Sequence, residues 1–178
     1  MRDDSAKWPL IDTDSLALEG PGVALHSLVV GRQTLVSGAG VLARFTERLG
    51  APVGWPDPAR GASYALGLGR DRLLLVNGPA LEDGWDARAG LAVSDMSGGY
   101  AVFGLCGPGI GAVLARAGEI DPARPSRSVA RLFLGLEALL YFHEAAPGGG
   151  QALRLHVSAS QAMALVEALE AVFRALGD

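Results

Sequence analysis

The feature that most constrains the fold of this chain is an order of predicted elements that occurs twice. In the first occurrence, a strand at 34–36 leads through Gly38 into a helical pattern that stops at Gly50. Two strands, at 63–68 and 73–76, then form a hairpin. Pro79 takes a favoured first-turn position and predicts a short helix toward Arg88. The order is therefore strand, helix, strand, strand, helix.

The same order returns roughly 70 residues later. A strand at 100–106 enters a helix after Gly107, three strands follow, and a helix closes the chain. The later strands are expected at 129–134, 138–143 and 153–157. The tetrapeptide Val41-Leu42-Ala43-Arg44 recurs as Val113-Leu114-Ala115-Arg116 on the equivalent helix. These matches predict an internal duplication: an α+β fold of two ferredoxin-like βαββα repeats with antiparallel or mixed sheets.

The C-terminal helix has the clearest local signals. Ser158 and Gln161 stand at the spacing of a capping box, in which each side chain satisfies a free backbone N–H of the first turn. Apolar residues follow at helical spacing, and Gly177 ends the pattern. These apolar residues are Ala162, Leu165, Val166, Leu169, Val172, Phe173 and Leu176.

The repeat divides the chain into three ranges. Residues 1–30 are expected to form an N-terminal arm and lead-in, 31–95 the first βαββα repeat and 96–178 the second. Residues 1–15 are expected to be extended, because Pro9 disfavours helix at Trp8, and to dock on a neighbouring chain. The alternative is that Trp8 packs on its own domain. The two sheets are expected to share one core, formed by Leu42, Leu74, Val102, Leu105, Leu114, Phe133, Leu139, Leu155, Leu165 and Leu169.

Charge and cysteine content argue against several functional classes. The net charge of −4 argues against a nucleic-acid binder, which needs a basic face for phosphates. The chain has no run of about 18 apolar residues that predicts a membrane span, and its first residues lack the apolar stretch of a secretory signal. Cys106 is the single cysteine and lies in an apolar strand, which predicts a buried thiol. A soluble protein of the reducing cytoplasm is expected.

The composition is apolar for a soluble chain. Hydrophobic residues make up 49% of it and charged residues only 19%. Two explanations stay open. A high-GC coding bias favours Ala, Gly and Arg, and a surface held against a partner is also poor in charge.

Two glycine loops stand where a strand enters a helix. Gly107-x-Gly109 and Gly38-x-Gly40 match a degenerate dinucleotide-binding fingerprint. Each following helix leads into a hairpin instead of the parallel strand that the nucleotide fold requires, and Pro108 removes a backbone donor. Tight strand-to-helix turns are the better interpretation of both loops.

The titratable side chains form no recognisable catalytic or metal-binding set. His26, His143 and His156 have no metal-type spacing, and a cross-strand pair of the last two would lack a third ligand. The remaining polar groups fit structural roles in turns, a helix start and an exposed hairpin. They are Asp95-Met96-Ser97, Glu82-Asp83 and Arg70-Asp71-Arg72. Neither a catalytic constellation nor a metal site is predicted.

Several of these short motifs nevertheless resemble a known family. The run 73–77, which ends at Asn77, and the following Trp85 resemble the strand-to-helix segment of the aminomethyltransferase superfamily, the glycine-cleavage T-proteins. A second set is similar to the gamma subunit of heterotetrameric sarcosine oxidase, whose length this chain also matches. Its members are Asp95-x-Ser97, Gly107-Pro108, Val113-Leu114 and Asp121.

The resemblance implies a T-protein-like fold and a non-catalytic accessory role. Such a subunit belongs to a heteromeric flavoenzyme that oxidises a secondary amine, with FAD, FMN and tetrahydrofolate on the larger partner subunits and no cofactor on this chain. Asn77 is the one position that matches a folate-pocket element of the T-proteins. The alternative is a stand-alone folate-binding protein of the aminomethyltransferase type, with Asn77 in its pocket.

Overall fold

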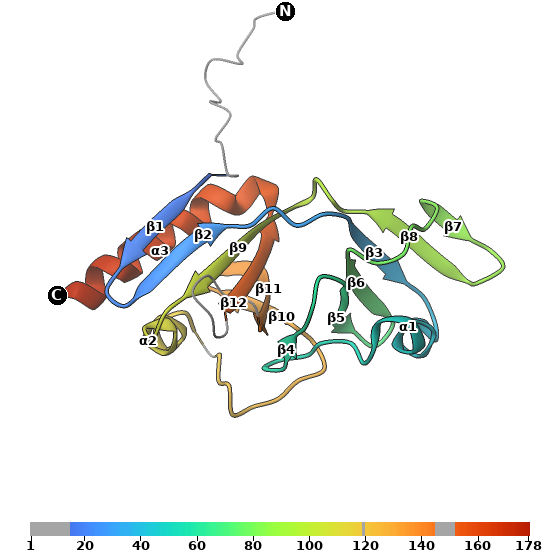
Figure 1. Cartoon of the computed structure of the whole chain (residues 1–178), viewed down its shortest axis with the longest axis horizontal. Helices are drawn as coiled ribbons and strands as arrows, with labels where there is room; N and C mark the ends of the chain where they lie inside the picture. The colour runs from blue at the N-terminus through green and yellow to red at the C-terminus, as the bar shows by residue number, and fades with distance from the viewer. Residues whose placement is uncertain (1–14, 119, 145–151) are drawn as a thin grey trace, which may run out of the picture.

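The chain forms two β-sheets that pack against each other by their inner faces, with two helices on the outer face of the larger sheet and one on that of the smaller (Figure 1). The structure is a computed structural model that describes residues 15–118, 120–144 and 152–178. The predicted arm at 1–15 lies outside the described residues except for Ser15. The sheets are antiparallel apart from one short parallel pairing, so the prediction of an α+β fold with antiparallel or mixed sheets is confirmed.

The larger sheet, with seven strands, is built mainly from the second half of the chain. Its strands, in spatial order, are β1 (Ala17–Gly20), β2 (Val23–Ser27), β9 (Tyr100–Cys106), β12 (Ala152–Ser158), β11 (Leu136–His143) and β10 (Ala130–Phe133). The two-residue β4 (Pro58–Ala59) pairs with β11 in parallel. The helices α2 (Ile110–Arg116) and α3 (Ala162–Gly177) belong to this half.

The smaller sheet, with five strands, comes from the first half of the chain. Its strands, in spatial order, are β5 (Tyr64–Gly69), β6 (Arg72–Val76), β3 (Gln33–Ser37), β8 (Leu91–Asp95) and β7 (Gly84–Asp86). Among the described residues, one helix, α1 (Val41–Leu49), packs on it. The predicted strand at 34–36, helix to Leu49 and hairpin of 63–68 with 73–76 are therefore confirmed within one or two residues.

The two halves exchange one hairpin each. β1 and β2 precede β3 in the chain but pair with β9, whereas β7 and β8 precede β9 but pair with β3. The spacing from β1 to β7 is the same as that from β3 to β9. Each repeat thus begins with a hairpin that completes the sheet of the other repeat. The two crossing connections, β2 to β3 and β8 to β9, run between the halves in Figure 1.

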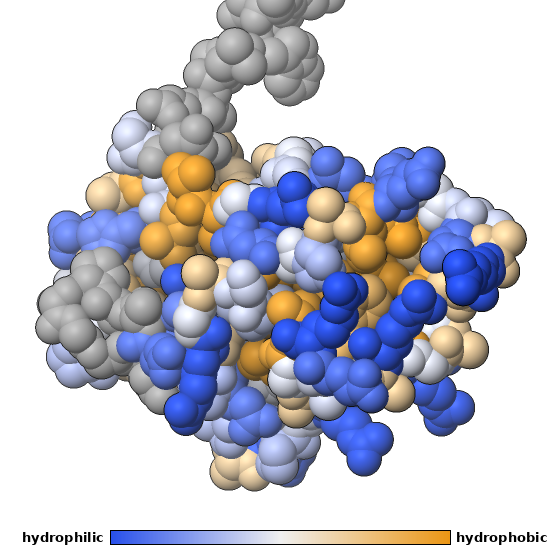
Figure 2. Space-filling view, turned by 45° about the vertical axis from the view of Figure 1, so that its right-hand side comes forward, coloured by the Kyte–Doolittle hydropathy of each residue, from blue (hydrophilic) through white to orange (hydrophobic). Residues whose placement is uncertain are grey.

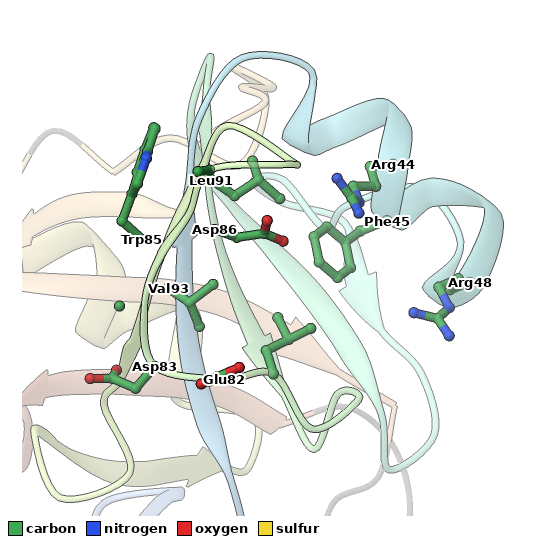
Figure 3. A pocket seen from close by; sticks show the side chains of 12 residues that line it. Arg44, Phe45, Arg48, Glu82, Asp83, Trp85, Asp86, Leu91 and Val93 are labelled. Carbon is green, nitrogen blue, oxygen red and sulfur yellow. The ribbon is translucent and has the colours of Figure 1, made fainter.

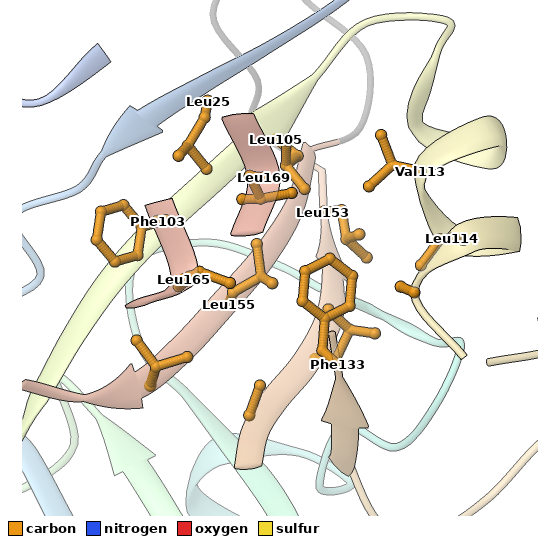
Figure 4. Close-up of a cluster of buried hydrophobic side chains, with 14 of the residues drawn as sticks. Leu25, Phe103, Leu105, Val113, Leu114, Phe133, Leu153, Leu155, Leu165 and Leu169 are labelled. Carbon is orange, nitrogen blue, oxygen red and sulfur yellow. The ribbon is translucent and has the colours of Figure 1, made fainter. Parts of the chain in front are cut away.

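The buried side chains of the described residues form three clusters instead of a single core, and one of the three is shared by the two sheets, as expected. One cluster fills the space between the larger sheet, α2 and α3 (Figure 4), and a second lies between the smaller sheet and α1. A third lies between the two sheets, where Leu66 and Leu74 meet Leu139. Helices cover only the outer face of each sheet, so the inner faces pack on each other.

Nine of the ten expected core residues are buried, and the exception is Leu42, which is half-buried. On α1, Val41 and Phe45 make the buried contacts. Leu42 is therefore turned partly out of the helix-side core, although its repeat partner Leu114 is buried.

The helix expected from Pro79 toward Arg88 does not form. Strand β7 occupies its second half and pairs with β8, and neither strand was expected. The carboxylate Oδ1 of Asp83 accepts the backbone N–H of Asp95 at 2.9 Å, which ties the segment to the sheet edge. Gly84 has a φ of 111°, a conformation outside the helical region. Pairing with β8 therefore overrides the weak local helix signal.

The capping box expected at Ser158 is also wrong. A 3-10 turn, Ala159–Gln161, precedes α3, and no side chain caps either element. The Ser158 hydroxyl lies 2.8 Å from that of Ser160 instead. The helix itself is confirmed, and its expected apolar positions Leu165, Leu169 and Phe173 are buried. Within the described ranges, no helix is long and apolar enough to span a membrane.

Candidate functional site

Five polar side chains meet in the layer between the two sheets, and we call them the intersheet polar cluster. Gln33 of β3 and Tyr64 of β5 come from the smaller sheet, and Tyr141 of β11 with Arg154 and His156 of β12 come from the larger one. Side chains alternate between the faces of a strand, so residues 141, 154 and 156 project from the face opposite the helices. All but Arg154 are buried.

The hydrogen bonds of this cluster form one continuous series from Arg154 to Gln33. Arg154 Nη1 donates to the Tyr64 hydroxyl at 2.9 Å, and the Tyr64 and Tyr141 hydroxyl oxygens lie 2.8 Å apart. The Tyr141 hydroxyl lies 2.8 Å from His156 Nε2, and His156 Nδ1 lies 2.8 Å from Gln33 Oε1.

The two ends of this series of hydrogen bonds, Arg154 and Gln33, determine which atom donates in each bond. A guanidinium donates only, so Tyr64 donates its hydrogen to Tyr141, which donates to His156 Nε2. His156 then carries its hydrogen on Nδ1 and donates to the amide oxygen of Gln33. Each hydroxyl hydrogen is used once, and the cluster binds the two sheets together without an ion pair.

Burial keeps the rings of this cluster neutral. Complete burial, with a smaller contribution from the Arg154 charge, lowers the pKa of His156 to about 3. Burial also raises the pKa of Tyr141 well above its ordinary value. At neutral pH both rings are therefore hydrogen-bonding groups that neither gain nor lose a proton, which suits a structural role.

The expected cross-strand pairing of His143 with His156 is wrong. His156 lies opposite Leu139, His143 lies opposite Ala152, and the pair of Tyr141 with Arg154 stands between them. His143 Nε2 lies 3.0 Å from the carbonyl oxygen of Gly61, and its ring meets Tyr64 edge-on. Within the described ranges, no three His, Cys, Asp or Glu side chains gather as metal ligands do.

Sequence reasoning missed Gln33, Tyr64, Tyr141 and Arg154. One signal in the sequence could have found them. Each is a polar residue in a strand, at a position where the alternation of side chains between the two faces predicts burial. Arg154 stands between Leu153 and Leu155, and such a placement marks either a partner across the sheet or a functional group. The Nε atom of Arg154 is buried and has no hydrogen-bond partner among the described residues.

A cavity of about 630 Å³ adjoins the cluster on the larger sheet. His156 forms part of its inner wall, Tyr100, Met96 and Leu139 line it, and Leu132 stands at its rim with 64% of its surface exposed. The Tyr100 and His156 rings meet edge-on with centroids 6.0 Å apart. The lining is mainly apolar, which fits an apolar side chain or ring better than a charged ligand.

Asn77, the folate candidate, lies at an exposed turn after β6 and is not among the residues that line the cavity beside His156. Its φ of 49° places it in the left-handed region, which asparagine tolerates. Its Nδ2 donates to the carbonyl oxygen of Ala62 at 3.0 Å, and its carbonyl oxygen accepts the Ser63 hydroxyl at 2.9 Å. These bonds fasten the turn to the start of β5.

The Asp95-x-Ser97 motif lies where β8 leads into the connection to β9. Asp95 Oδ1 accepts both the backbone N–H and the hydroxyl of Ser97, at 2.9 and 2.6 Å, and these bonds lower the pKa of Asp95. Ser97 Oγ in turn accepts the backbone N–H of Gln33 at 3.1 Å. The motif therefore positions the strand residue that ends the polar cluster.

The glycine loops are turns, as expected. Gly107 has a φ of 113°, and a Cβ there would lie 2.4 Å from the carbonyl oxygen of Gly22. Gly109 donates its N–H to the same oxygen at 2.8 Å. The loop thus packs on the turn between β1 and β2, where a phosphate would have to sit. Nearby, Cys106 is half-buried, and burial raises the pKa of its thiol.

Comparison with known proteins identifies the fold. No family model matches the sequence, and no curated protein matches it. Among solved structures, a chain of heterotetrameric sarcosine oxidase from Corynebacterium sp. U-96, in complex with pyrrole 2-carboxylate, superposes with a TM-score of 0.66. The two chains are 21% identical, and the match covers 93% of this chain and 90% of the other. The two chains therefore share one fold over almost their whole lengths.

Proposed function

We propose that this chain is a non-catalytic, gamma-type accessory subunit of a heteromeric flavoenzyme similar to sarcosine oxidase, which oxidises a secondary amine. FAD, FMN and tetrahydrofolate belong to larger partner subunits of that assembly. The match to a chain of a heterotetrameric oxidase, over nearly the full length of both chains, is the observation that carries the proposal.

The intersheet polar cluster supports an accessory role. A general acid or base works best when its pKa lies near the operating pH and it can reach a substrate. His156 is fully buried and its pKa is about 3, while Tyr141 is buried with a raised pKa. His156 and Tyr141, whose pKa values are shifted far from their ordinary values, thus hold the sheets together by hydrogen bonds.

Coexpression with the chains encoded beside its gene tests the proposal. We expect a tagged copy to co-purify with two flavoprotein-like chains in a fixed ratio, and the assembly to carry bound flavin and oxidise sarcosine or a related secondary amine. The isolated chain, supplied with the same amine and an electron acceptor, is the control and should show no turnover.

Two results would contradict the proposal. Failure of the chain to assemble with any of these proteins would remove the subunit role. Amine oxidation by the isolated chain would remove the non-catalytic role.

A further inference from the structure

The two halves of the chain differ in how their outer sheet faces are covered. On the larger sheet, α3 packs beside α2 and against β1 and β12. The repeat makes α1, β7 and β6 the counterparts of α2, β1 and β12. The smaller sheet has only α1 in this place, because the segment between β6 and β7 is too short and irregular to form a second helix.

A groove of about 490 Å³ lies at this position, and we call it the α1–β7 groove. Phe45 of α1 and Leu91 and Val93 of β8 form its base, and Leu81 borders it. Gly84 of β7 faces open space, since a Cβ added there would meet no atom within 4 Å. Figure 2, which brings this half of the molecule forward, shows apolar surface in hollows between hydrophilic side chains.

The two rims of the groove carry opposite charges. Arg44 and Arg48 project from α1 on one side, and Glu82, Asp83 and Asp86 stand on the other (Figure 3). All five are exposed, and no ion pair joins the two rims in the part of the chain that the structure describes. Trp85 of β7 also lines the groove, and 68% of its surface is exposed.

We propose that the α1–β7 groove receives one amphipathic helix from a partner chain of the assembly, lying where α3 lies in the other half. This inference rests on the proposed function, because it needs a partner. The apolar stripe of the helix packs on the partly buried Leu81, above the buried Phe45. Its acidic flank faces Arg44 and Arg48, and its basic flank faces Glu82 and Asp86. Burying an amphipathic helix in an apolar groove with complementary rims is a recurrent mode of recognition.

Reversing a charge on each rim tests whether a partner helix binds in the groove, because the rim residues are exposed and do not belong to the core. The probes are the partner chains encoded beside the gene, purified and titrated with this protein. We expect Arg48→Glu and Glu82→Arg each to weaken assembly about fivefold or more, with a loss that shrinks at high salt. Arg88→Glu makes the same charge change as Arg48→Glu, outside the groove lining, and should leave the affinity unchanged.

Hydrogen exchange gives an independent readout. In the complex, amides of α1 and of residues 81–87 should exchange more slowly than in the isolated chain. Each variant should keep the thermal midpoint of the wild type, which shows that a weaker affinity is not a folding defect.

The outcomes separate this inference from the proposed function. If the wild-type chain binds no partner, both fail. If the wild type assembles but the rim variants bind as tightly as Arg88→Glu, or the groove amides keep their exchange rates, the groove inference alone is overturned. It is also overturned if the variants abolish self-association of this chain, because a second copy would then be the occupant.

Discussion

The hydroxyl oxygen of Tyr141 lies 2.8 Å from Nε2 of His156, and neither side chain is exposed to solvent. Tyr141 also bonds Tyr64 across the gap between the sheets. It is therefore the central link between a group of the smaller sheet and a histidine of the larger one.

Replacing Tyr141 with phenylalanine should destabilise the protein. The substitution leaves the hydroxyl hydrogen of Tyr64 without its acceptor and His156 Nε2 without its donor, which costs about 1–3 kcal/mol. Chemical denaturation measures the loss. Tyr100→Phe, at a half-buried ring for which the structure shows no hydroxyl partner, is the matched control and should change the free energy of unfolding little. An equal effect of the two substitutions would contradict the role given to the cluster.

The stability of the protein should fall as the pH is lowered from about 6.5 toward about 4. The unfolded chain binds a proton at His156 below its ordinary pKa of 6.5, whereas burial keeps the folded side chain neutral down to a pKa of about 3. Unfolding therefore takes up one proton in this window, and stability falls by about 1.4 kcal/mol per pH unit.

Denaturant titrations at several pH values test this slope. The pKa of His143 is also lowered, by burial and by the Arg154 charge, and adds a contribution of the same sign. His156→Gln should remove the contribution of His156 and leave that of His143. The interpretation fails if the slope of this variant equals that of the wild type. Asp95, whose pKa is lowered from 3.8, affects stability only at lower pH.

Two N-terminal truncations should behave differently. Deleting residues 1–15 should leave the thermal midpoint nearly unchanged and weaken assembly with partner chains. Deleting residues 1–27 also removes β1 and β2, which leaves β9 paired with β12 alone and takes Val23 and Leu25 from the core. We expect the longer deletion to unfold the chain. A large loss of stability in the shorter deletion would show instead that Trp8 packs on its own domain.

Truncating Leu165 should leave a cavity in the larger core. The side chain is fully buried between α3 and the sheet (Figure 4), so Leu165→Ala should cost about 2–5 kcal/mol in the free energy of unfolding. Leu132→Ala is the control, because 64% of Leu132 is exposed and its truncation should have little effect. Similar losses for both variants would mean that the core is not packed as described.

Titration with a reduced folate tests the alternative role of Asn77. Its side chain and carbonyl hold the turn after β6, so Asn77→Ala should destabilise the chain by about 1 kcal/mol through a lost hydrogen bond and a strained φ. We expect no saturable folate binding by the isolated wild-type chain. Saturable binding that Asn77→Ala removes, in a variant that is still folded, would favour the stand-alone folate-binding role.

Local sequence patterns determined most of the individual elements. The apolar strand from Tyr100 to Cys106, the helix after Gly109 and the helix that buries Leu165 and Leu169 depend on neighbours within a few positions, so their periodicity is visible in the chain. The repeated order of strand, helix and hairpin was also visible in the sequence, although only the second half continues into a helix after its hairpin.

Only the tertiary structure decided how these elements combine. The exchange of the β1–β2 and β7–β8 hairpins depends on pairing between segments far apart in the chain, which leaves no local signal. Pairing with β8 also turned the segment after Pro79 into a strand, which left the α1–β7 groove open. His156 and Tyr141 met Gln33 and Tyr64 because the two sheets pack face to face, and the energy of burying polar groups depends on partners that only this packing supplies.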